Sequence, residues 1–343
     1  MRHFRPDHGK TILTPNDVQF LLRYFAGIDQ ALCRRYSLGF RPDEEHLTSL
    51  LCELLDSKGV ELHNLPYGIA QLNEDLKQSG SLVRAEISVK TNAYNKHQER
   101  YLTQSDLGII VEYEDRVEPA LSFKNGVLVQ AKRLFPLRNG EYGLDSKYES
   151  FDEDQHLRLE KLMKDFGVLA GGDPEFGSHC AKYLFYNPPL ADLPIREREK
   201  IIHSQLRRET SSIFDYTAGL HVYQDLSQAE VNSTRLKSAC LFMPLAGVHA
   251  LALKAGQNKR TSAAGTATVA AFTLGDVVEA ADIRFSSLPY FFVFELIMNN
   301  VGCSGDDFIK FITESASGRV RELQFTSPRY LLHIRLTAGS VEG

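Results

Sequence analysis

The sequence lacks the cysteine patterns that mark disulfide-stapled domains and zinc knuckles. Its 343 residues include only five cysteines, and none of them lies in a CxxC or CxxxC pair: Cys33, Cys52, Cys180, Cys240 and Cys303. An odd number of scattered cysteines argues against a disulfide framework and against a cysteine-bound metal. We therefore expect five reduced thiols in a cytoplasmic protein.

Long hydrophobic runs and a large net charge are also missing. The longest apolar run, at 288–298, contains Pro289 and Glu295 and is about half as long as a membrane span. The opening segment MRHFRPDHGK has no apolar stretch typical of a signal peptide. We therefore expect no association with a membrane. The formal net charge of −5 means that any nucleic-acid contact must come from a local basic patch.

Hydrophobic periodicity in the first 190 residues predicts a mixed order of helices and strands. Leucines recur at helical spacing after Pro42, and alternation begins at Val83. Two later runs are almost continuously apolar, which is typical of central strands covered on both faces. The predicted helices lie at 15–35, 43–56 and about 155–167, and the predicted strands lie at 83–89, 106–114, 126–134 and 180–188.

The later part of the chain gives weaker signals. Residues 190–236 look helical and polar, and residues 254–269 are rich in Gly, Ala and Thr, which indicates a loop. A capping box at 304–307 predicts a helix to about Glu314, and RYLLHIRLT alternates like a final strand. We place a domain boundary near residue 236.

Polar residues stand at the ends of the two apolar strands. Asp106 opens the first run, and Gln130 and Lys132 close the second. If the strands pair as antiparallel neighbours around residue 119, Asp106 lies opposite Gln130 and Lys132, which share one face of their strand. An extra short strand at 120–123 would shift this register by a residue or two.

A carboxylate, an amide oxygen and an ammonium group on one face suit phosphodiester hydrolysis. The oxygens of Asp106 and Gln130 would hold a hard cation such as Mg²⁺, and the backbone carbonyl of Ala131 would add a ligand. Lys132 would orient or deprotonate the attacking water and steady the developing negative charge. These residues are therefore candidate catalytic and metal-binding groups.

The helix at 43–56 contributes a fourth candidate. At about 100° per residue, Glu44 lies roughly 50° from the centre of the leucine stripe and Glu45 about 150° away. We expect Glu44 to face the site and Glu45 to support it from the solvent side. Glu44 as an ordinary first-turn acid that complements the helix dipole is the alternative. Gln155 either supports the site or is a hydrogen-bonded core amide.

In this order, these residues resemble the PD-(D/E)xK restriction-endonuclease-like nucleases, in the variant where glutamine replaces the second acid. The resemblance covers roughly residues 40–190. It is carried by Glu44 with Leu47-Thr48, by Ser105-Asp106-Leu107-Gly108, by Gln130-Ala131-Lys132, and by the helix near Gln155 with the strand after it. The resemblance implies that Asp106 and Gln130 bind metal, that Lys132 is catalytic and that Glu44 completes the metal site.

The resemblance implies an α/β fold with a restriction-endonuclease-like core, a mixed central sheet flanked by helices. We assign this nuclease domain, with its N-terminal helices, to residues 1–236 and a C-terminal α/β region packed on it to 237–343. The implied activity is that of an Mg²⁺- or Mn²⁺-dependent endonuclease, with DNA as the favoured substrate and prokaryotic defence as the implied role. A homo-oligomer or a partner protein of a defence system is left open.

Two other functions fit the same residues. Gln130 brings one negative charge fewer than an acid would, so a catalytically silent module that binds nucleic acid or assembles with a partner is one alternative. Retention of Lys132 argues against it. A hydrolase of nucleotides or other small phosphoesters is the other alternative, and a narrow, closed pocket would favour it.

Overall fold

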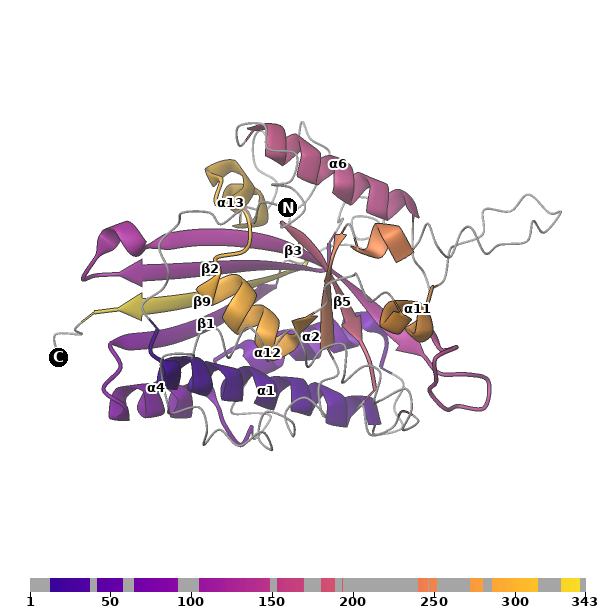
Figure 1. Ribbon diagram of the computed structural model, residues 1–343, viewed down its shortest axis with the longest axis horizontal. Helices are drawn as coiled ribbons and strands as arrows, with labels where there is room; N and C mark the ends of the chain where they lie inside the picture. The colour runs from indigo at the N-terminus through magenta and orange to yellow at the C-terminus, as the bar shows by residue number, and fades with distance from the viewer. Residues whose placement is uncertain are drawn as a thin grey trace.

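The protein is a mixed α/β structure in which helices cover a large central sheet (Figure 1). The computed structural model describes residues 13–37, 42–57, 65–91, 105–148, 153–169, 180–188, 193, 240–245, 247–251, 272–279, 286–313 and 328–339. Its helices are α1 (Pro15–Ser37), α2 (Glu44–Leu55), α4 (Ile69–Gln78), α6 (Glu153–Leu169), α11 (Leu274–Glu279), α12 (Leu288–Tyr290) and α13 (Asp306–Thr313), with a 3₁₀ turn η1 (Pro119–Leu121) and a π-helix η4 (Phe291–Met298). Its strands are β1 (Val83–Thr91), β2 (Leu107–Asp115), β3 (Phe123–Phe135), β4 (Lys147–Tyr148), β5 (Ala181–Tyr186), β6 (Cys240–Pro244), β7 (Phe272–Thr273), β8 (Ser286–Ser287) and β9 (Tyr330–Ala338).

These strands form one nine-stranded mixed sheet. The main order is β1-β9-β2-β3-β5-β6-β8, and β4 joins β3 to β7 at one side. β9 is antiparallel to β1 and parallel to β2, while β3 is antiparallel to β2 and parallel to β5. The last strand of the chain therefore lies between the first two, and strands from both sides of residue 236 share the sheet.

Helices pack on both faces of the sheet and enclose two hydrophobic clusters. Figure 1 shows α1, α4 and α12 on one side and α6 and α13 on the other. Alternating strand residues separate the clusters: Ile109 and Val129 join the cluster of α1 and α2, whereas Ile110 and Leu128 join that of α6 and α13. β2 and β3 are thus covered on both faces, as their continuous apolar runs predict.

Local signals in the sequence set the helix starts. At α1, the Thr14 N–H donates to Asp17 Oδ2 at 2.8 Å and the Asp17 N–H donates to Thr14 Oγ1 at 3.2 Å, which is a reciprocal capping box. Asp43 caps α2 by accepting from the His46 N–H at 2.7 Å. The leucine stripe of α2 is buried, as expected: Leu47, Leu50, Leu51, Leu54 and Leu55.

The pairing of β2 with β3 follows the predicted antiparallel hairpin. Leu107 pairs with Val129 and Tyr113 pairs with Phe123, so the centre of the hairpin falls within about a residue of position 119. Residues 119–121 form η1, and β3 already begins at Phe123. The register therefore brings the start of β2 to the middle of β3, next to Gln130.

Two of the five cysteines form a disulfide, contrary to the expectation that all five are reduced. Cys180, just before β5, and Cys303, just before α13, form a disulfide with their Cα atoms 5.3 Å apart. The expectation of five reduced thiols is therefore wrong for these two, because 123 residues separate them and spacing rules report only near neighbours. Cys33, Cys52 and Cys240 are buried and belong to no disulfide.

The C-terminal signals were mostly correct. A helix, α13, begins at Asp306 in the segment where a helix start was predicted, RYLLHIRLT forms β9, and the aromatic run after residue 288 is buried in the core. The loop expected at 254–269 and nearly all of the segment expected to be helical at 190–236 lie outside the described residues.

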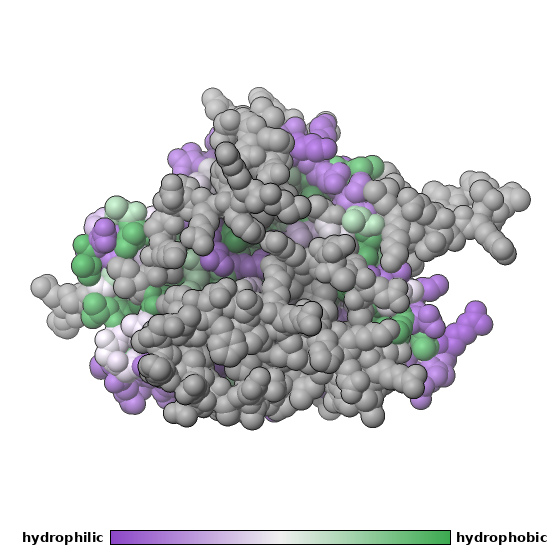
Figure 2. All heavy atoms as spheres, in the orientation of Figure 1, coloured by the Kyte–Doolittle hydropathy of each residue, from purple (hydrophilic) through white to green (hydrophobic). Residues whose placement is uncertain are grey.

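The described surface has few exposed hydrophobic side chains. Large ones are Leu82, Val117 and Leu157, which lie on separate parts of the chain, and hydrophobic and hydrophilic residues are intermixed on the face in Figure 2. Within the ranges that the structure describes, no helix is long and apolar enough to cross a membrane.

Candidate functional site

Asp106 closes the end of the β2–β3 ladder. Its N–H donates to the Val129 carbonyl at 3.0 Å, and its Oδ2 accepts the Ala131 N–H at 2.7 Å and the Gln130 Nε2–H at 2.5 Å. The Ala131 N–H lies beyond the last pair between the two strands, so the carboxylate replaces the backbone carbonyl that a longer strand would supply. The predicted contact between Asp106 and Gln130 is confirmed.

Lys132 lies farther along β3 and meets the first turn of α2. Its Nζ is 3.4 Å from Glu44 Oε1, and the two side chains are 5% and 28% exposed. Thr48 helps to hold this turn, since its hydroxyl donates to the Glu44 carbonyl at 2.9 Å and accepts from the Tyr186 hydroxyl of β5 at 3.2 Å. The helical angle correctly separated Glu44 from Glu45.

Burial dominates the electrostatics of both carboxylates. It raises the pKa of Glu44 from its ordinary value to about 7, with Lys132 opposing the shift and Asp106 adding to it. Burial also raises the pKa of Asp106, against the influence of Lys132 and the Ala131 N–H. Because Asp106 contributes to the shift at Glu44, the two groups influence each other, and an added positive charge between them would favour ionisation of both.

Glu45 lies at the margin of this group. It is exposed and forms an ion pair with Arg329, with Oε1 2.5 Å from a guanidinium nitrogen. Glu45 raises the pKa of Asp106 and Arg329 lowers it, both less than burial does. Arg329, directly before β9, is a neighbour that the sequence did not suggest, because nothing local links it to residue 45. Gln155 belongs to α6, but its side chain lies outside the described residues.

The donor set fits a divalent cation in its chemistry. Two carboxylates, an amide and a backbone carbonyl are oxygen ligands of the kind that Mg²⁺ and Mn²⁺ prefer. Gln130 at present directs its Nε2–H toward Asp106, so a cation beside Asp106 would require the amide to turn and present its oxygen. Burial raises the pKa values of Asp106 and Glu44. A cation bound beside them would stabilise the ionised carboxylates and lower both pKa values.

A second group of polar side chains lies under α6. His156 and Glu160 of α6 and His249 of the helical residues 247–251 bring their ligand atoms within 4.8 Å of one another. The sequence analysis missed this group. The spacing of four residues between His156 and Glu160 is a local signal. His249 lies far along the chain, and no short sequence pattern connects it with the other two residues.

Comparisons with known proteins do not add to this picture. A scan against protein-family models and searches of curated proteins and of solved structures found no match to this chain.

Proposed function

We propose that the protein is a metal-dependent nuclease that hydrolyses phosphodiester bonds, with DNA as its substrate. The observation that carries the proposal is the meeting of α2, the start of β2 and the middle of β3 at one strand end. There Asp106 contacts Gln130, and Lys132 contacts Glu44. Polar groups buried at such a place are costly unless they are paired or used.

Each residue has a distinct task in this proposal. Asp106, Glu44, the Gln130 amide and the Ala131 carbonyl would hold Mg²⁺ or Mn²⁺, which supplies stabilisation of charge on the phosphoryl oxygens. Lys132 would orient the attacking water and donate a hydrogen bond to the phosphate as negative charge grows. Its buried position keeps this charge out of bulk water, where the interaction would be weaker.

The arrangement of elements supports a restriction-endonuclease-like core. β1 and β2 run in opposite directions with β9 between them, β2 and β3 form the hairpin, and β5 lies parallel to β3. A parallel neighbour requires a crossover connection, which here contains α6. The insertion of β9 between β1 and β2 is the one departure of these strands from the expected order.

The proposal includes a biological role, which is defence against foreign DNA.

Cleavage of supercoiled plasmid DNA tests the proposal. We expect wild-type protein to nick or linearise the plasmid with Mg²⁺ or Mn²⁺ but not with EDTA. Asp106→Asn and Lys132→Met should each lower the rate by at least about 100-fold, which is the usual cost of losing a preorganised catalytic group. Circular dichroism and thermal melting should show that both variants remain folded.

The chain offers a matched control for each variant. Lys182→Met removes another buried strand lysine, 3.2 Å from Glu295 and 6% exposed. Asp115→Asn changes a buried carboxylate at the opposite end of β2, which accepts the backbone N–H groups of Val117 and Glu118. If these controls lose as much activity as the site variants, the loss reflects stability and the site assignment fails.

One observation favours a catalytically silent module instead. Asp106 is already hydrogen-bonded by Gln130 and Ala131, and Lys132 is already paired with Glu44, so the group satisfies much of its own polarity without a cation. In that case no variant affects plasmid integrity, and DNA binding measured by fluorescence anisotropy is unchanged by Mg²⁺. Binding without cleavage would replace the nuclease proposal.

A further inference from the structure

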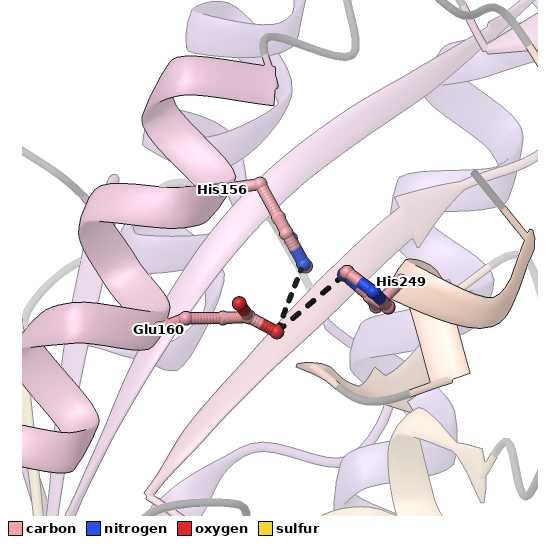
Figure 3. A group of neighbouring side chains, drawn as sticks. All are labelled: His156, Glu160 and His249. Atoms are coloured by element: carbon pink, nitrogen blue, oxygen red, sulfur yellow. Dashed lines mark ion pairs between the residues drawn. The ribbon is translucent and has the colours of Figure 1, made fainter. Parts of the chain in front are cut away.

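His156, Glu160 and His249 converge from two helical segments at a place separate from Asp106 and Lys132. Figure 3 shows His156 and Glu160 projecting from α6 toward His249, with dashed lines that join one Glu160 carboxylate oxygen to a nitrogen of each ring. We propose that these three residues bind one transition-metal ion of the zinc class. This inference does not depend on the proposed nuclease activity.

Helical geometry accounts for two of the ligands. Residues four apart lie on the same side of a helix, so His156 and Glu160 both face the sheet side of α6. His156 is buried, and Glu160 and His249 are partly buried. The group is thus accessible to an ion but held within the packed structure, unlike a cluster of surface acids.

The distances match a metal site better than hydrogen bonds. Glu160 Oε1 lies 3.5 Å from His156 Nε2 and 3.6 Å from His249 Nδ1. A direct N–H···O hydrogen bond would be about 2.7–3.2 Å. Two ligands each about 2.0–2.1 Å from a tetrahedral zinc are roughly 3.3 Å apart. The two distances from Glu160 are thus close to the ligand separation around one zinc ion, and all three ligand atoms lie within 4.8 Å of one another.

Tyr183 prepares His156 for this role. The Tyr183 hydroxyl of β5 lies 3.1 Å from His156 Nδ1, so this contact engages the ring nitrogen that points away from Glu160. A hydrogen bond at the far nitrogen is the usual way in which proteins orient a metal-binding imidazole. The His156 and His249 rings are also nearly parallel, 5.5 Å apart at 23°, which brings both rings to the same side of the carboxylate.

The donor types select the metal. Two imidazoles and one carboxylate suit zinc and related transition metals, whereas Mg²⁺ prefers oxygen ligands alone. Three protein ligands leave a fourth position for water or another group. An ion there would join α6 to residues 247–251 beside β5, where Tyr183 pairs with Gln130 of β3, and so would fix the helix that covers this part of the sheet.

Zinc titration of chelator-treated protein tests the site. We expect wild-type protein to bind one equivalent of Zn²⁺, measured by competition with a chromophoric chelator. Co²⁺ should give the intense visible absorption of a tetrahedral nitrogen and oxygen site. His249→Ala should abolish stoichiometric binding, and Tyr183→Phe should weaken it by about 10–100-fold, as expected for a residue that orients a ligand.

His333→Ala is the matched control. Its side chain is 35% exposed and lies 3.1 Å from Glu112, whereas His249 is 40% exposed and pairs with Glu160. His333→Ala should bind Zn²⁺ as wild type does. Absence of stoichiometric Zn²⁺ in folded wild-type protein would overturn the proposal, as would equal affinities of His249→Ala and His333→Ala. Neither result depends on whether the protein cleaves DNA.

Discussion

Asp106 and Glu44 are acids placed where burial disfavours their charged forms. Two hydrogen bonds to one oxygen of Asp106 offset part of the cost of burying its charge. At Glu44, the contact with Lys132 offsets part of this cost. Lys132 lowers the pKa values of both groups and the Ala131 N–H lowers that of Asp106, yet burial still dominates both shifts. The folded protein therefore holds protons at this site at pH values where the unfolded chain has released them.

This difference predicts how stability depends on pH. Because the pKa of Glu44 rises to about 7, its contribution to the unfolding free energy is fully present below about pH 4.5 and is lost as pH rises through 7. The loss is at most about 3 kcal/mol. We expect urea unfolding of chelator-treated protein to show a smaller decrease over this range in Glu44→Gln than in wild type.

The unfolding free energy of Glu44→Gln should still fall as pH rises, because burial raises the pKa of Asp106 as well. The neighbouring exposed residue provides the control: Glu45→Gln should keep most of the wild-type slope. If wild type and Glu44→Gln lose the same stability between pH 4.5 and 7, Glu44 does not hold the proton, and the electrostatic description of the site is wrong.

Residue positions near one another in sequence were predictable, and distant ones were not. The angle around α2 separates Glu44 from Glu45, and a hairpin fixes Asp106 beside Gln130, because both depend on local geometry. His249 and Arg329 meet their partners only through the fold of the whole chain. No periodicity in the sequence reports such contacts.

At the scale of elements, α13 packs unusually close to β2. A Cβ built on Gly108 would lie 2.6 Å from Ile312 Cγ2 and 2.8 Å from Pro328 Cγ. Real Cβ atoms essentially never lie within 3.0 Å of another heavy atom. Only glycine at position 108, two residues after Asp106, therefore allows Ile312 of α13 to lie this close to β2. The glycine therefore sets the distance between the helix and the strand that begins at the candidate site.

Gly108→Ala should consequently destabilise the protein by about 1–3 kcal/mol through overpacking. Gly27→Ala, inside α1, provides the contrast: a Cβ there meets nothing within 4 Å, and alanine should stabilise the helix by about 0.5–1 kcal/mol. Denaturant unfolding of both variants measures the difference. Equal stability of Gly108→Ala and wild type would show that α13 can shift away at little cost.

Elements with their own signals were recovered, but their order in the sheet was not. Caps and leucine spacing identify α1 and α2, and alternation identifies β1 and β9. α4 was missed, since its first turn lacks a side-chain cap. The insertion of β9 between β1 and β2 was not predictable, because strands far apart in sequence choose their neighbours by packing.

Three long-range links hold the C-terminal part of the whole molecule to its centre. β9 pairs with β1 and β2, and the segment before α13 forms backbone hydrogen bonds in both directions between Cys303 and Gly126 of β3 at 2.9 Å. The Cys180–Cys303 disulfide lies at the same junction. The chain after η4 is thus fastened to β3, the strand that carries Gln130 and Lys132, and to the start of β5.

The disulfide gives a prediction for the whole molecule. Denatured but unreduced protein should take up three alkyl groups, on Cys33, Cys52 and Cys240, and reduced protein should take up five. Because the bond closes a span of 123 residues, reduction should lower the unfolding free energy by about 2–4 kcal/mol. The double variant Cys180→Ala/Cys303→Ala should melt at the same temperature with and without reductant. Five alkyl groups on unreduced protein would contradict the disulfide and restore the expectation drawn from cysteine spacing.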